Sequence, residues 1–268
     1  IEGEHEGLTE FPSIVAGPVE EQIAESIVDR MTNGACIQLG VGGMPDAIGK
    51  LIAESELKDL GIHTELLVNA YLDMHKAGKI TNLNKHDIMR GKSVFSIAHG
   101  TKELFDWVSD NPSMCCAPIN YVNDLSVIGE IDNFVSINSC IAVDLFGQIS
   151  AESAGTRHIS GTGGQLDFLT AGFKNPRAQS FIALPSTYTD KKGNLHSNIK
   201  PTFTGGDIIT DPRSQAYTMV TEYGIENLAG ASVWERAEKL INLAHPDFRE
   251  ELIESAKKVN VWRQSNKR

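Results

Sequence analysis

Cysteine is scarce in this chain, and its spacing argues against two kinds of structure. Of the 268 residues only four are cysteines, Cys36, Cys115, Cys116 and Cys140. Two of them are adjacent, and no pair has the C-x-x-C spacing of a zinc or redox site. The eight histidines are scattered, without the H-E-x-x-H pattern of metalloproteases. We therefore expect neither a disulfide framework nor a metal site, and a cytoplasmic, reducing compartment.

Long apolar runs and clusters of basic residues are also lacking. No apolar stretch reaches the roughly 20 residues that a membrane-spanning helix needs. Lys and Arg number 24 against 35 Asp and Glu, which gives a formal net charge of −11. Because phosphate contacts along a nucleic acid need clustered Lys and Arg, we expect neither nucleic acid nor a membrane as a partner. A small phosphorylated ligand held by local groups is still compatible with an acidic chain.

The first 17 residues differ from the rest in composition. The opening IEGEHEGLTEFPS is polar, rich in turn-forming residues and begins with Ile1. We expect residues 1–17 to be a linker or the edge of a longer polypeptide, and residues 18–268 to form one domain.

From residue 18 onward, helical and strand patterns alternate. An amphipathic helix is predicted over 18–32, followed by a strand over 36–40, a glycine loop, a helix through AIGKLIAESEL and the strand HTELLV. This order is a βαβ unit, so its two strands should be parallel neighbours. The remaining elements expected are helices over 69–77 and 101–110, strands over 93–100, 180–187 and 219–228, two strands within 135–153, and two C-terminal helices. The pattern predicts an α/β fold, a mostly parallel open sheet flanked by helices, with some hairpins.

Two glycine-rich loops each separate a strand from a helix. They are GVGGMP, which starts at Gly40, and SGTGGQLDF, which starts at Ser160. Glycines let a backbone approach a ligand closely, and the free N–H groups at a helix start favour an anion. Each loop would equally suit a tight structural turn. Neither is a complete G-x-G-x-x-G or Walker A sequence.

An acid stands inside a strand pattern, in GIHTELLVNA over 61–70. In open parallel sheets, ligands lie beyond the carboxyl ends of the strands, and Gly40 and Glu65 should both be near such ends. A carboxylate can act as a nucleophile, and loop N–H groups can stabilise an oxyanion, which is what acyl transfer to a carboxylate requires. The alternative is a structural acid that pairs with His63 or caps the helix after Val68.

Six motifs follow one another along the chain without large gaps, and together they make a family resemblance specific. The chain resembles the acetyl-CoA hydrolase/transferase family, and within it the butyryl-CoA:acetate and 4-hydroxybutyrate CoA-transferases, in GVGGMPDAI, GIHTELLVNAYLDMHKAGKITN, VSINSCIAVDLFGQISAES, SGTGGQLDF, VTEYGIENLAG and AHPDFRE. The resemblance runs from about residue 18 to the C-terminus. It implies a CoA-transferase-like fold, a homo-oligomer such as a homodimer, and a preceding N-terminal domain in the same polypeptide.

The resemblance also implies roles for single residues. Glu65 lies where the family has its nucleophile, and Asn123 and the Gly164 N–H correspond to groups that bind the acyl oxyanion. The residues that correspond to contacts with coenzyme A are Gly40, Val41, Gly42, Gly43, Met44, Ser160, Gly163 and Lys192. Leu66 and Asn69 differ from residues that relatives often carry there, and we expect both beside the acyl pocket.

The implied activity is ping-pong transfer of CoA between a short-chain acyl-CoA, such as butyryl-CoA, and a carboxylate such as acetate. Coenzyme A would be a substrate, with no tightly bound cofactor and no metal. A thioester hydrolase on the same scaffold is one alternative, and a CoA- or nucleotide-binding domain without chemistry is another. Glu222, in VTEYG, is expected to be structural or to gate the site.

Overall fold

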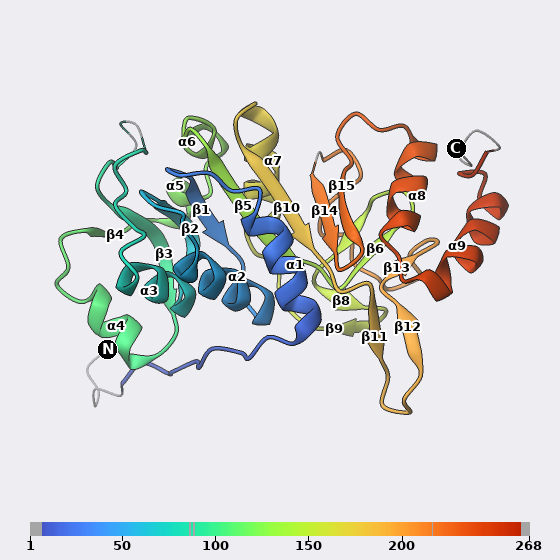
Figure 1. Ribbon diagram of the computed structural model, residues 1–268, viewed down its shortest axis with the longest axis horizontal. Coiled ribbons are helices and arrows are strands. Elements are labelled where there is room, and N and C mark those ends of the chain that lie inside the picture. Colours follow the sequence, from blue (N-terminus) through green and yellow to red (C-terminus); the bar gives the residue numbers. More distant parts are fainter. Residues whose placement is uncertain (1–6, 86, 88, 216, 264–268) are drawn as a thin grey trace.

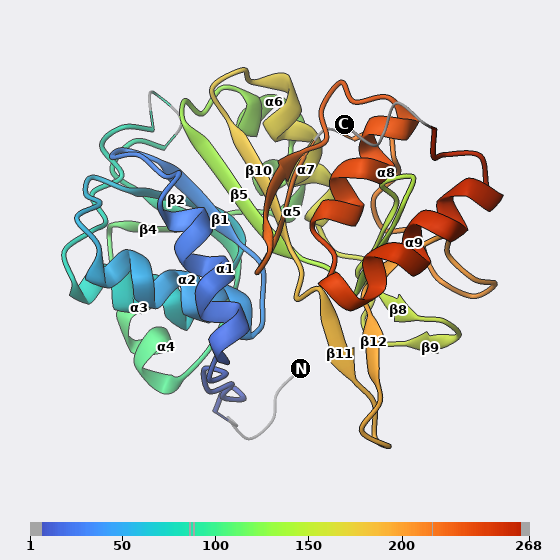
Figure 2. The same cartoon turned by 45° about the vertical axis from the view of Figure 1, so that its right-hand side comes forward.

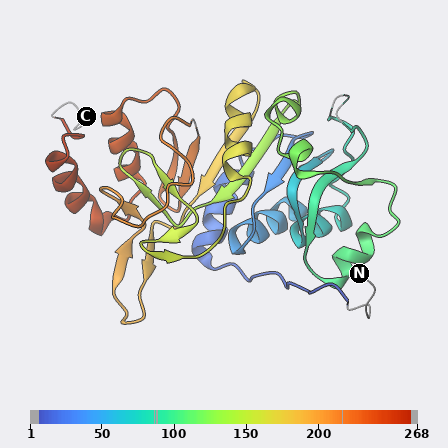
Figure 3. The same cartoon turned by 180° about the vertical axis from the view of Figure 1, so that it is seen from behind.

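The main feature of the molecule is a twisted sheet with helices on both faces (Figures 1 and 3). The computed structural model describes residues 7–263 except 86, 88 and 216. Within these residues the main sheet has eight strands, and all of its neighbouring pairs are parallel except β14–β15. The order is β15 (Gly224–Asn227), β14 (Thr218–Thr221), β10 (Gln179–Ala183), β5 (Phe134–Ser139), β1 (Cys36–Leu39), β2 (Gly61–Val68), β3 (Ser93–His99) and β4 (Met114–Cys116). The α/β fold class predicted from the alternating pattern is confirmed.

The two helical layers bury alternate residues of the strands. On one face Ile37 of β1 belongs to the core formed with α1 (Pro18–Val28), α2 (Gly43–Glu54), α3 (Asn69–Lys76) and α4 (Lys102–Val108). On the other face its neighbour Cys36 packs with α5 (Ile119–Val122), α6 (Leu125–Gly129) and α7 (Gln165–Lys174). All four residues of β1 are buried, as expected for a parallel strand covered on both sides. The βαβ prediction is confirmed, because β1 and β2 are parallel neighbours.

The C-terminal part has a hydrophobic core of its own. Helices α8 (Val233–Asn242) and α9 (Pro246–Lys258) lie beyond the β14–β15 edge of the main sheet (Figure 2). A small sheet packs with them, in the order β13 (Ile199–Lys200), β6 (Ala142–Asp144) and β7 (Ile149–Ser150). Two hairpins project from the same end of the molecule (Figures 1 and 2), β8 (Ser153–Ala154) with β9 (Arg157–His158), and β11 (Thr187–Thr189) with β12 (Leu195–Ser197).

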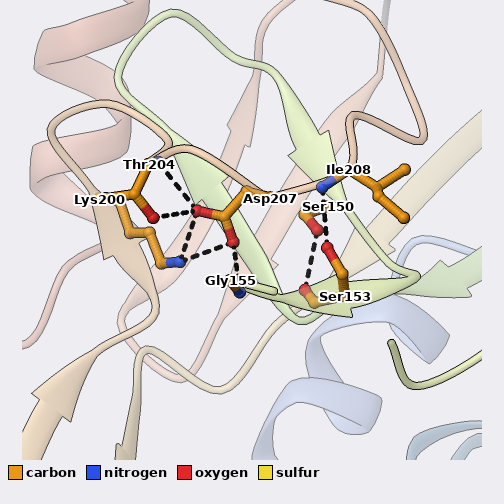
Figure 4. A network of polar contacts seen from close by, with 7 residues as sticks. All are labelled: Ser150, Ser153, Gly155, Lys200, Thr204, Asp207 and Ile208. Atoms are coloured by element: carbon orange, nitrogen blue, oxygen red, sulfur yellow. Dashed lines mark hydrogen bonds and ion pairs between the residues drawn. The ribbon is translucent and has the colours of Figure 1, made fainter. Parts of the chain in front are cut away.

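A polar network fixes the β8–β9 hairpin (Figure 4). The fully buried carboxylate of Asp207 accepts hydrogen bonds from the N–H groups of Gly155, at 2.8 Å, and Thr204, at 2.9 Å. Next to it the Ile208 N–H donates to Ser153 Oγ at 2.8 Å. The network joins the loop after β13 to the chain that leads, through β9, into the second glycine loop.

Three predicted elements differ in the structure. The strand expected over 219–228 is the β14–β15 hairpin, because Gly224 turns the chain with a φ of +146°. The strands expected within 135–153 belong to different sheets: β5 joins the main sheet, while β6 and β7 pair across the turn at Gly147. The first helix ends at Val28, four residues before its predicted end, and the chain continues through a turn at Asp29 and Arg30.

Residues 7–17 contain no helix or strand, but they are held on the domain. The Phe11 N–H donates to Gly100 O at 2.9 Å, and the Phe11 ring stacks on His99 with centroids 4.0 Å apart. The Ile14 N–H donates to Asp46 Oδ2 at 2.7 Å. This segment therefore follows the side of the molecule formed by α4, α3 and α2 before it enters α1 (Figure 1).

Of the helices in the described part of the chain, none has the length and apolar character needed to cross a bilayer.

A close contact between α2 and α3 gives a test of the packing. A Cβ at Gly49 would lie 2.3 Å from Ala70 Cβ, whereas a Cβ at Gly129 would meet nothing within 4 Å. We expect Gly49→Ala to lower the free energy of unfolding by about 1–3 kcal/mol through overpacking. The matched control, Gly129→Ala, should raise it by up to about 1 kcal/mol, because a helical glycine loses more backbone entropy on folding. Urea unfolding measures both, and equal stabilities would contradict the contact.

Candidate active site

Glu65 lies just beyond the point where β1 and β2 part. Their parallel pairing aligns Cys36 with Gly61 and Ile37 with Ile62 and then stops; continued in the same register, it would bring Gly40 level with Glu65. β1 ends before this point, whereas β2 continues and stays paired with β3. The half-buried Glu65 side chain therefore meets a gap beside its own strand, and the first glycine loop begins at the same level.

Three residues from separate elements, Glu65, Asn123 and Gly164, are in close contact at the Glu65 carboxylate. Glu65 Oε2 accepts a hydrogen bond of 2.7 Å from Asn123 Nδ2, at the C-cap of α5. Gly164, the N-cap of α7, completes the contact. A Cβ on Gly164 would lie 2.0 Å from Glu65 Oε2 and 2.2 Å from Asn123 Nδ2, so a side chain there would displace both. A Cβ on Gly163 would lie 3.9 Å from Glu65 Oε1, which is an ordinary contact.

The Asn123 amide lies between two carboxylates. Its Nδ2 is 3.4 Å from Asp167 Oδ2 in the first turn of α7, while its buried Oδ1 has no hydrogen-bond partner among the described residues. The start of α7 carries the positive end of a helix dipole. Negative charge that develops on an oxygen next to Glu65 would therefore meet an amide donor and a helix N-terminus.

His63 faces the same side of β2 but does not pair with Glu65. Its ring is fully buried, and Nε2 lies 2.8 Å from Val122 O. A carbonyl oxygen only accepts, so Nε2 carries the proton, and the buried Nδ1 has no partner in the described part of the chain. Burial and, second, the charge of Lys85 lower the pKa of His63 to about 4, so the ring is neutral at pH 7. Val68, the N-cap of α3, makes no side-chain capping bond, so neither structural partner expected for Glu65 is seen.

Two cavities give access to Glu65. One, of about 490 Å³, has a mixed lining that includes the polar Asn120, Asn123 and Asp167 and the apolar Ile119 and Leu125. The other, of about 450 Å³, is more apolar and is lined by Leu39, Val41, Leu66, Ile159 and Phe168 among others. Glu65, Gly163 and Gly164 line both cavities. The carboxylate can thus be approached from two sides.

The residues expected to contact coenzyme A fall into two groups. Gly40, Val41, Ser160 and Gly163 line the cavities. Others begin α2 and do not line either cavity: Gly42 makes the turn with a φ of +115°, a Cβ on Gly43 would lie 3.4 Å from Ile14, and Met44 is buried. Lys192 lies in the turn of the β11–β12 hairpin, where its N–H donates to Asp190 Oδ1 at 2.8 Å, outside both cavities.

Of the two substituted positions, only Leu66 faces the site. The expectation that Asn69 lies beside the acyl pocket is wrong. Its Oδ1 accepts from the Thr101 N–H at 3.0 Å, and its Nδ2 donates to Phe11 O at 3.2 Å. Because α3 begins at Asn69, the alternation of the strand no longer sets the direction of the side chain.

Glu222 also makes a structural contact, since it accepts from the Ser186 N–H at 2.9 Å and from Ser186 Oγ at 2.5 Å.

Further polar residues that the motifs did not single out support the second glycine loop. The backbone oxygen of Glu152 accepts from the N–H groups of Ile159, at 2.8 Å, and Ser160, at 3.2 Å. Gln165 donates to the buried Asp211 at 2.6 Å. Burial raises the pKa of Asp211 to about 6. The hydrogen bond from Gln165 acts in the opposite direction, and the charge of Glu152 adds to the rise. The sequence carries no signal for the Gln165–Asp211 contact, because the two residues are 46 positions apart in the chain. Within the described residues, no group of three or more His, Cys, Asp or Glu is arranged to hold a metal ion.

Comparison with known proteins places this geometry in a family. The model of the acetyl-CoA hydrolase/transferase C-terminal domain matches residues 100–256. The chain belongs to the acetyl-CoA hydrolase/transferase family. The resemblance inferred from the six motifs is confirmed.

Two family members and a solved structure show the extent of the similarity. The butyryl-CoA:acetate CoA-transferase of Anaerostipes caccae is 52% identical over 268 residues, which are 100% of this chain and 60% of that protein. The 4-hydroxybutyrate coenzyme A transferase of Clostridium kluyveri is 41% identical over 96% of this chain and 58% of its own length. The crystal structure of RipA from Yersinia pestis superposes with a TM-score of 0.86 at 39% identity, over 96% of this chain and 56% of RipA. The chain therefore spans less than two thirds of these proteins.

The buried ring of His63 predicts a pH effect on the stability of this family member. The pKa of the ring is about 4 when folded against a reference of 6.5, so between these values the unfolded state binds more protons. The free energy of unfolding should therefore fall as the pH falls from 6.5 to 4, by about 3 kcal/mol from this group.

The variant His63→Gln lacks this group and should lose correspondingly less stability over that range. Urea unfolding of both proteins at a series of pH values measures the difference. Asp211, whose raised pKa acts in the opposite direction, is present in both proteins and cancels in the comparison. Parallel pH profiles would contradict the assignment.

Proposed function

We propose that this chain carries the nucleophile of a CoA-transferase that moves CoA between a short-chain acyl-CoA, such as butyryl-CoA, and a carboxylate such as acetate. One observation carries the proposal: Asn123 donates to Glu65 at 2.7 Å at a point where only glycine fits at position 164. The butyryl-CoA:acetate CoA-transferase that is 52% identical supports the same reading.

In the proposed reaction, Glu65 attacks the thioester carbonyl of the acyl-CoA. The C–S bond breaks, and CoA thiolate leaves behind a mixed anhydride between Glu65 and the acyl group. The thiolate then attacks the glutamyl carbonyl, which releases the acyl group as a carboxylate and leaves a glutamyl-CoA thioester. An incoming carboxylate reverses both steps and departs as its CoA ester. Because one thioester replaces another, the exchange needs no ATP.

The neighbours of Glu65 support each step. We assign the oxyanion that forms at each attack to two donors, the Asn123 amide, which already donates to Glu65, and the N–H of Gly164 at the start of α7. The cavity lined by Leu39, Leu66 and Phe168 provides apolar surface for methylene groups of a short acyl chain or of the CoA arm. Access from two sides lets one substrate leave while another approaches the same carboxylate.

Hydrolysis is the alternative outcome on the same scaffold, since the family includes hydrolases. The two activities differ in whether water or a carboxylate consumes the glutamyl thioester. An assay of CoA release and acyl-CoA formation, with and without added acetate, separates them. For a transferase, turnover depends on acetate and forms acetyl-CoA.

The compartment and the assembly are further parts of the proposal. The four cysteines are free thiols, which supports a reducing compartment such as the cytoplasm. We expect the complete protein to be a homo-oligomer.

The substitution Glu65→Gln tests the nucleophile. It keeps the shape and an acceptor for Asn123 but removes the attacking anion, so kcat should fall by several orders of magnitude. CoA binding should persist and the melting temperature should change little, because Glu65 is only half-buried. The matched control is Asp167→Asn, which removes the other carboxylate near Asn123 and should cost far less. A Glu65→Gln enzyme with wild-type kcat would exclude the mechanism.

Borohydride tests the covalent intermediate, because it reduces a glutamyl thioester to an alcohol. Protein treated with acyl-CoA and borohydride should lose activity, and mass spectrometry should place the reduced side chain at Glu65. Protein treated with borohydride alone should keep its activity, and Glu65→Gln should show no reduced product. Full activity after the complete treatment would count against the covalent route.

A further inference from the structure

We infer that His63 is a positioning residue, which holds the Asn123 amide against Glu65 through the backbone carbonyl of Val122. The inference deepens the proposed function and rests on it, because it concerns the donor that faces the proposed nucleophile. His63 itself touches neither Glu65 nor either cavity.

Strand β2 contacts the end of α5 at two points. His63 and Glu65 are two residues apart and face the same side of the sheet. His63 bonds to Val122 O at 2.8 Å, and Glu65 bonds to the side chain of the next residue, Asn123, at 2.7 Å. The bond from His63 fixes the backbone at Val122. The bond to Glu65 is made by the side chain of Asn123, which is attached to the same stretch of backbone.

The end of α5 needs such an anchor. The helix comprises only Ile119–Val122, and Asp124, immediately after Asn123, is already the N-cap of α6. A helix of one turn is not stable by itself, because its few internal hydrogen bonds do not offset the entropy of ordering it. The position of Asn123 must therefore be set by contacts with the sheet, and the His63 bond is the one next to it.

The histidine carries a cost that an apolar residue would avoid, and its bond to Val122 O is the polar contact that offsets it. Its ring is fully buried beside Tyr121 and Phe134, with centroids 6.5 Å and 6.4 Å away. Its Nδ1 has no partner within the described structure. An apolar side chain would avoid the unsatisfied nitrogen, but it would leave Val122 O without this donor. What the histidine adds is one N–H donor, directed at Val122 O.

The direction of the Asn123 amide depends on this anchoring of the backbone. Because Oδ1 is unpartnered, the direction of the amide depends on the Nδ2 contacts with Glu65 and Asp167 and on the backbone beneath it. A displacement of roughly 1 Å at a reacting group can cost about 10²-fold in rate. Release of the Val122 carbonyl would allow such a displacement.

The test compares His63→Asn with His63→Gln in the complete natural protein. Both side chains are neutral amides, but the glutamine nitrogen reaches about as far as Nε2 of histidine, whereas the asparagine nitrogen stops near the position of Nδ1. We expect His63→Asn to lower kcat by about 10- to 100-fold with little change in KM for acyl-CoA. His63→Gln should recover much of this loss. If His63→Asn does not fold, His63→Phe takes its place, because it keeps the ring and lacks the donor.

A double-mutant cycle shows whether His63 acts through Asn123. In an Asn123→Ala background, His63→Asn should cause almost no further loss in kcat, because the amide that it positions is gone. A loss of the same size in both backgrounds would overturn the inference in favour of a general structural role. His245→Asn is the matched control. That ring accepts from the Asp247 N–H at the start of α9, at the opposite end of the molecule from β2 (Figure 1), and its loss should leave kcat unchanged.

Crystal structures of the His63 variants give a result that does not depend on any activity. The Asn123–Glu65 distance should stay near 2.7 Å in His63→Gln and lengthen beyond hydrogen-bond range in His63→Asn. An unchanged distance in His63→Asn would overturn the inference. Absence of CoA transfer in the wild-type protein would instead overturn the proposed function, and the distance would still report on His63.

Discussion

The close fit of Gly164 against the Glu65–Asn123 hydrogen bond is the constraint on which the site depends. Glu65 belongs to the sheet, whereas Asn123 and Gly164 belong to the helical layer above it. A Cβ at Gly164 would lie within 2.2 Å of both partners, so the start of α7 can approach the sheet only as glycine. The approach brings the start of a helix, an amide and a carboxylate together with no side chain at position 164.

Buried polar groups hold the segments that supply these residues. His63 is tied to Val122, which precedes Asn123, and Asp211 is tied to Gln165, which follows Gly164. Burial shifts both pKa values toward the neutral form, down to about 4 for His63 and up to about 6 for Asp211. Such groups contribute little to stability compared with apolar packing. Their position next to site residues indicates that they serve geometry.

Separation of the strands creates room for chemistry within a densely packed fold. β1 ends at Leu39, before the level of Glu65, while β2 continues to Val68, so the carboxylate stands beside a gap that the first glycine loop borders. The cavities on its two sides differ in character, one with a mixed lining and one more apolar. The ping-pong exchange proposed for this chain needs a single carboxylate that two different substrates can reach in turn, and this arrangement is compatible with it.

The sequence alone determined the alternating α/β fold, the parallel β1–β2 pair and the acid inside a strand pattern, because these follow from periodicity over a few neighbouring residues. The six motifs added the family and pointed to Gly164, and the resemblance to that family pointed to Asn123, which lies outside them. Only the tertiary structure decided that His63 anchors Val122, that Asn69 faces Phe11, and that Lys192 lies outside both cavities. These contacts depend on how helices dock on the sheet. The Asn123–Glu65 bond joins residues 58 positions apart, and no local pattern in the chain specifies the distance between them.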